Sequence, residues 1–190
     1  MMPAAPGDVL AVWTGRGITQ DAIRIADVLE GKPAVANHVI GITHKDKAGR
    51  WIGLEGRPGG FGLADVTPYL NDPRTRSNHE QPKTPKQLKF LLAGAAKLTG
   101  TPYDWVGIAE DDVRAIDLGG LEPVLDQLWR WPAQPSGLLP GHVVCSSAWA
   151  WLYALPAVGL AHPKVPERVT TPGDWWLFNN DQAWTGGKDK

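Results

Sequence analysis

The sequence predicts a single α+β domain, and three features support this fold class. A length of 190 residues fits one compact domain that can bury a core. Apolar residues make up 43% and charged residues 21%, as is usual for a globular protein. Strand patterns and a hairpin occur in the first third of the chain, and amphipathic helices follow. We found no repeat or linker, so residues 1–190 are expected to form one domain.

The first predicted elements are a strand, a helix and a hairpin. Residues 8–13 have the composition of a short strand, and residues 18–29 carry apolar side chains at helical spacing. Gly31 and Pro33 end that helix. Two further strands are predicted at residues 37–44 and 51–55, joined by a polar turn.

The register of this hairpin follows from the length of its turn. If Lys45 pairs with Arg50, or if the turn has two residues, then Ile40 pairs with Glu55. With a three-residue turn, Glu55 would instead lie on the opposite face of the hairpin from Ile40. Strand alternation also places four side chains on one face: His38, Ile40, Ile42 and His44.

The rest of the chain is predicted to be largely helical. Residues 71–84 are polar and predict a solvated loop. Thr84 and Gln87 form a capping box for a helix, with Pro85 at its first position. The buried stripe of this helix is expected to be Leu88, Leu91, Leu92, Ala95 and Leu98. Residues 121–128 are amphipathic, a third helix begins near Cys145, and residues 175–178 predict a final short strand.

The charge balance argues against several classes of partner. Lys and Arg total 19 against 20 Asp and Glu, so no global field attracts nucleic acid. No segment approaches the roughly 20 apolar residues that span a bilayer. The N-terminus lacks the pattern of a secretory signal. We therefore expect a cytoplasmic protein with no membrane span and no nucleic-acid partner, with release by another route left open. The sequence does not indicate the oligomeric state.

Cys145 is the only cysteine, which excludes an intrachain disulfide and a cysteine-rich zinc site. A single cysteine side chain either packs inertly in the core or takes part in a reaction. The predicted helix places Cys145 in its first turn, where backbone N–H groups and the helix dipole lower a thiol pKa. The same N–H groups can hold an oxyanion. These properties make Cys145 a candidate nucleophile.

A cysteine nucleophile needs a histidine base, and His38 is the best of the five histidines. His79 lies in the polar loop, His162 follows an irregular turn, and His142 is only three residues before Cys145. His44 lies beside the hairpin turn. If Ile40 pairs with Glu55, then Glu55 is a diagonal neighbour of His38 on the same face, with roughly 7 to 8 Å between the two backbones. Glu55 could then orient the imidazole.

A metal site built from His38, His44 and Glu55 is the alternative use of these residues, because imidazole and carboxylate bind zinc. At about 3.3 Å per residue, His44 lies roughly 20 Å from His38 along a strand. One ion cannot bridge that span. We therefore predict no metal and no cofactor.

The order of these motifs resembles the circularly permuted NlpC-type papain-like cysteine hydrolases, with YiiX-like proteins the nearest comparison. The resemblance rests on His38 within Asn37-His38-Val39-Ile40-Gly41-Ile42, Glu55, Tyr103-Asp104-Trp105, Cys145-Ser146-Ser147 and an opening strand that includes Pro6 to Leu10. It covers most of the chain. The chain departs from the family pattern in two loops, at residues 71–83 and 111–140, which leaves the substrate open.

The resemblance implies a small antiparallel sheet packed with helices and a Cys145-His38-Glu55 triad. It also implies cleavage of an amide or peptide bond through an acyl-enzyme, with a peptide, amide or acyl substrate and peptidoglycan among the candidates. The role of Tyr103 stays open. Two alternatives remain: an acyltransferase or thioesterase of the same fold, and a non-catalytic binding or virion structural module.

Overall fold

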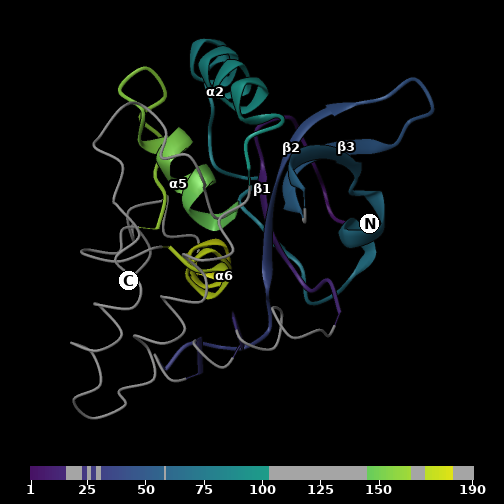
Figure 1. Cartoon of the computed structure of the whole chain (residues 1–190), viewed down its shortest axis with the longest axis vertical. Helices are drawn as coiled ribbons and strands as arrows, with labels where there is room; N and C mark the ends of the chain where they lie inside the picture. The colour runs from purple at the N-terminus through teal and green to yellow at the C-terminus, as the bar shows by residue number, and fades with distance from the viewer. Residues whose placement is uncertain are drawn as a thin grey trace.

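Figure 1 presents the computed structural model, which describes residues 1–15, 23–24, 27–28, 31–57, 59–102, 145–163 and 170–181. Within these residues the chain forms one five-stranded antiparallel sheet and three α-helices. The strand order is β4-β3-β2-β1-β5. The predicted α+β class is therefore confirmed. None of the helices in the described ranges has the length and apolarity needed to cross a membrane.

Three of the five strands were expected. They are β1 (Val9–Val12), β2 (His38–Lys45) and β3 (Trp51–Arg57). Two strands were not predicted: β4 (Gly60–Asp65), which pairs with β3, and the short edge strand β5 (Arg76–Ser77), which pairs with β1. A 3-10 helix, η1 (Thr67–Asn71), follows β4.

The turn between β2 and β3 is longer than expected. Asp46 N–H donates to Arg50 O at 2.9 Å, and Gly49 adopts a φ of 81° in the left-handed region that favours glycine. The Asp46 carboxylate also accepts from the N–H groups of Ala48 and Arg50. These bonds stabilise a three-residue turn. Lys45 consequently pairs with Trp51, so the predicted pairing with Arg50 is wrong.

A second irregularity restores the expected register further along. The pairing shifts by one residue between Ile42 and His44, as a β-bulge does when it adds a residue to one strand. Beyond the bulge, Ile40 pairs with Glu55 as predicted. The bulge interrupts strict alternation, and His44 at its far side is exposed.

The three helices are α2 (Pro85–Leu98), α5 (Cys145–Ala154) and α6 (Pro172–Asn180). The predicted capping box of Thr84 and Gln87 is present at α2. The strand expected at residues 175–178 is wrong, because this segment lies inside α6. Thr171 and Asp174 form a capping box here too, with Pro172 at the start of the helix. Local capping therefore prevails over the strand propensity of the aromatic residues.

The sheet is buried on both faces. Val9, Ala11 and Val39 belong to the larger core cluster, which also contains residues of α2, α5 and α6. Leu10, Val12 and Ile40 belong to a second cluster with η1 and the chain start. Neighbouring residues of one strand thus serve opposite faces, as the two-residue strand period requires. The helices α5 and α6 lie together on one side of the sheet (Figure 1).

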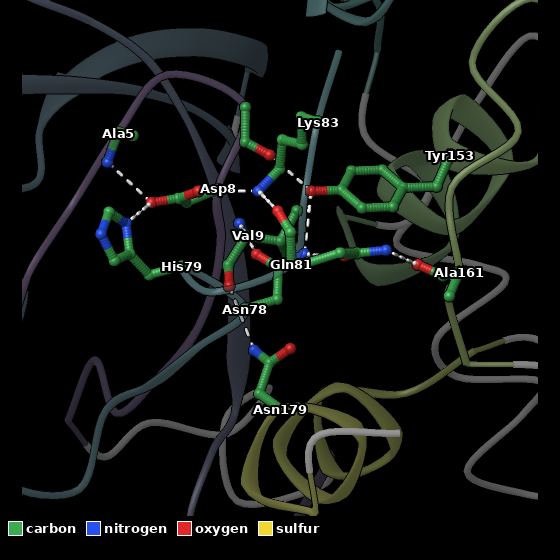
Figure 2. Close-up of polar contacts among 11 residues, drawn as sticks. Ala5, Asp8, Val9, Asn78, His79, Gln81, Lys83, Tyr153, Ala161 and Asn179 are labelled. Atoms are coloured by element: carbon green, nitrogen blue, oxygen red, sulfur yellow. Dashed lines mark hydrogen bonds and ion pairs between the residues drawn. The ribbon is translucent and has the colours of Figure 1, made fainter. Parts of the chain in front are cut away.

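Segment 71–84 is not the fully solvated loop that its composition predicts, because part of it is buried in a polar network (Figure 2). Asp8 accepts from Ala5 N–H at 2.6 Å, forms a hydrogen bond with His79 and forms an ion pair with Lys83. Asn78 bonds to both the backbone of Val9 and the hydroxyl of Tyr153. The network fastens α5, through Tyr153, to the start of β1.

Candidate active site

Cys145 is the first residue of α5, as the sequence predicted. Its side chain has 0% exposure and belongs to the larger core cluster. The next residue, Ser146, donates its hydroxyl to Thr170 O, and Trp175 Nε1 donates to Ser146 O at 2.9 Å. These bonds hold the first turn of α5 against the start of α6. Core packing around Cys145 and the hydrogen bonds of Ser146 together fix the position of the thiol.

His38 is the first residue of β2 and pairs with Val12 of β1. Its side chain is nearly buried, and its Nε2 lies 3.1 Å from Oε2 of Glu55. The ring also forms a hydrogen bond with the side chain of Cys145. Glu55 occupies Nε2, which leaves Nδ1 as the nitrogen available to the sulfur. The structure thus brings together all three residues that the sequence selected.

Glu55 is held between two cationic groups. It is buried on β3, opposite Ile40, and one carboxylate oxygen faces His38. Nε and Nη2 of Arg57 both contact the other oxygen, Oε1. Each carboxylate oxygen therefore has a partner, which fixes the orientation of the group. An orienting carboxylate needs this kind of restraint.

The charges of the site reinforce one another. Burial by itself lowers the pKa of His38, but negative charge on Cys145, the hydrogen bond with its sulfur and the Glu55 carboxylate raise it, so that the pKa is about 10. Burial raises the pKa of Glu55, but His38 and Arg57 outweigh it and lower this pKa below the usual value. The raised pKa of His38 favours an imidazolium beside Cys145, and the lowered pKa of Glu55 favours an ionised carboxylate near neutral pH.

Arg57 is the site residue that the sequence analysis missed. Continuing the Ile40–Glu55 register by two residues on each strand places Arg57 opposite His38. The predicted pairing of Ile40 with Glu55 was therefore sufficient to identify Arg57 as a neighbour of His38. The pKa of Tyr69 in η1 is raised, mainly by burial and secondly by the negative charge of Glu55. Tyr69 is therefore close enough to Glu55 to feel its charge.

Other residues considered from the sequence do not join the site. His44 is exposed and its Nδ1 lies 3.0 Å from Thr43 Oγ1. His79 pairs with Asp8 in the polar network. Tyr103 and His142 lie outside the described residues. Within the part of the chain that is described, no group of three or more His, Cys, Asp or Glu side chains is arranged to hold a metal ion.

No protein-family model matches the chain, and a search of curated proteins found no significant match. The functional interpretation therefore rests on geometry and chemistry. A thiol at a helix start, a bonded imidazole and an oriented carboxylate are the parts that nucleophilic catalysis requires. This set can generate a thiolate, transfer a proton and stabilise the charged imidazole.

Proposed function

We propose that this protein is a cysteine hydrolase that cleaves an amide or peptide bond through Cys145, His38 and Glu55. One observation carries the proposal: the His38 ring is bonded to Cys145 and to Glu55 at the same time. The three residues come from three different elements, α5, β2 and β3. Chance packing rarely assembles a nucleophile, a base and an orienting acid in this order.

The proposed mechanism begins with attack of the Cys145 thiolate on the substrate carbonyl carbon. Backbone N–H groups in the first turn of α5 stabilise the oxyanion of the tetrahedral intermediate. His38 then gives its proton to the leaving amine, which departs and leaves an acyl-enzyme. A water molecule deprotonated by His38 hydrolyses the thioester and regenerates the thiol. Glu55 keeps the imidazole oriented and stabilises its charged form throughout.

We also propose that the fold is the circularly permuted NlpC-type papain-like fold. In the chain, the strands that carry His38 and Glu55 precede the helix that begins with Cys145. The antiparallel sheet with helices packed on it agrees with the coarse architecture of that family.

A non-catalytic binding or structural module is the second candidate, and the complete burial of Cys145 favours it. Free cysteine is often a buried packing residue, and a substrate cannot reach a sulfur that has no exposed surface. Catalysis requires local opening above the thiol. The two candidates therefore differ in whether Cys145 reacts with small reagents faster than an unfolded chain does.

The test combines covalent labelling with a substrate screen. Wild type, Cys145→Ala, His38→Ala and the surface control His44→Ala are incubated with muropeptides, simple peptide amides and acyl esters. We expect turnover and an acyl adduct on Cys145, detected by mass spectrometry, in wild type and His44→Ala only. Folding of each variant is checked by circular dichroism, and an added amine acceptor distinguishes transfer from hydrolysis. Absence of any adduct, with thiol labelling no faster than in urea, would establish the non-catalytic reading.

A further inference from the structure

Arg57 has a second face that the triad does not use. Its Nε and Nη2 contact Glu55, which is its only ion-pair partner within the described ranges. A guanidinium carries five N–H donors in a planar fork. The contact with Glu55 therefore leaves both hydrogens of Nη1 and one of Nη2 unused. The side chain is 54% exposed, so this free edge faces solvent.

The free edge belongs to a side chain that is linked to His38 through Glu55. Arg57 and His38 contact different oxygens of the Glu55 carboxylate, and continuing the Ile40–Glu55 register by two residues on each strand places Arg57 across from His38. His38 in turn bonds Cys145. A group bound at the exposed edge of Arg57 would thus approach the site from the Glu55 side of the imidazole.

The chemistry of the edge selects one kind of ligand. The Nη1 and Nη2 donors of a guanidinium match the two oxygens of a carboxylate, and such bidentate pairs are stronger than neutral hydrogen bonds.

We propose that Arg57 determines substrate specificity by binding a carboxylate, and that the substrates are amides or peptides with a free carboxylate close to the scissile bond. This inference rests on the proposed function of Cys145 and His38. It assigns two contacts to one side chain: the inner edge positions Glu55, and the outer edge binds the substrate.

The test compares two alkylating reagents that differ only in charge. Iodoacetate and iodoacetamide both react by displacement of iodide by the Cys145 thiolate, which forms a carbon–sulfur bond without a proton donor. Opening of the buried site and changes in thiolate population affect both reagents alike. The ratio of the two rates at low ionic strength therefore isolates attraction of the carboxylate.

We expect Arg57→Gln to lower the iodoacetate-to-iodoacetamide rate ratio by about tenfold, the effect of losing one hydrogen bond between charged groups. Arg57→Lys keeps the charge without the fork and should give an intermediate ratio. Arg50→Gln is the matched control, because Arg50 is an exposed arginine in the β2–β3 turn paired with Asp46. Its ratio should equal that of wild type.

A second measurement needs only wild type, in case an Arg57 variant does not fold. N-acetylglycine should protect Cys145 from iodoacetamide at a concentration about tenfold lower than N-acetylglycinamide, which lacks the carboxylate. An unchanged rate ratio in a folded Arg57→Gln, or equal protection by the two compounds, overturns the role of Arg57 and leaves the hydrolase proposal intact. A Cys145 that reacts with neither reagent faster than the unfolded chain overturns both.

Discussion

Gly41 and Trp149 form the contact that sets the distance between β2 and α5. Gly41 lies three residues after His38, and Trp149 lies four residues after Cys145. A Cβ atom at position 41 would lie 2.0 Å from Cζ2 and 2.2 Å from Cε2 and Cη2 of the Trp149 ring. Trp149 is fully buried and cannot turn away into solvent. The substitution Gly41→Ala should therefore push the strand and the helix apart.

The magnitude follows from ordinary contact distances. Non-bonded carbon atoms pack at about 3.5 to 4.0 Å, so α5 must move by roughly 1.5 Å or distort. Overpacking of this kind costs about 1 to 3 kcal/mol of stability. A misplacement of about 1 Å can lower catalysis by about 100-fold. We expect Gly41→Ala to show both effects, with Cys145 moved away from His38.

Urea unfolding measures the first effect, and the rate of Cys145 alkylation by iodoacetamide measures the second. Gly62→Ala on β4 is the matched control, because no atom lies within 4 Å of a Cβ at that position. Trp149→Phe removes the fused ring that the new methyl group meets. The double variant should lose less stability than the sum of the single changes. If Gly41→Ala matches Gly62→Ala in stability and matches wild type in alkylation, the packing argument is wrong.

Three further outcomes are expected. Glu55→Ala should keep activity about 100-fold above that of folded Cys145→Ala or His38→Ala, measured as kcat/KM, because an orienting group assists a base that still acts without it; equal loss would give Glu55 a direct chemical role. Burial raises the pKa of Asp27 from 3.8 to about 6, so the folded protein holds this proton more tightly than the unfolded chain does. The resulting stabilisation is complete below pH 3.8 and is lost as pH rises through 6. Between pH 4 and pH 7 the change is about 2 kcal/mol in the unfolding free energy, and Asp27→Asn should abolish it in urea unfolding; an unchanged pH dependence in the variant contradicts it. Thr84→Ala should lower the unfolding free energy by about 1 kcal/mol through loss of the α2 cap, and a loss near zero would mean that the cap is redundant.

The pairing of Ile40 with Glu55 was predicted correctly, although the pairing next to the turn was not, because two features compensate for each other. The turn has three residues, which by itself would move Glu55 to the other face. The bulge between Ile42 and His44 reverses that shift, so Ile40 still meets Glu55. Neither feature is encoded by alternation of apolar residues. Asp46 and Gly49 favour the longer turn locally, whereas the bulge depends on how β2 fits between its neighbours.

The sequence by itself determined the elements that depend on local interactions and the residues that can do chemistry. Spacing and capping predicted β1, β2 and α2, the start of α5 at Cys145 and the choice of His38, because these depend on neighbours a few residues apart. Only the tertiary structure decided the burial of Cys145 and the contact of its sulfur with His38. Those properties depend on packing between segments that are distant in the chain, and local propensities do not encode such contacts.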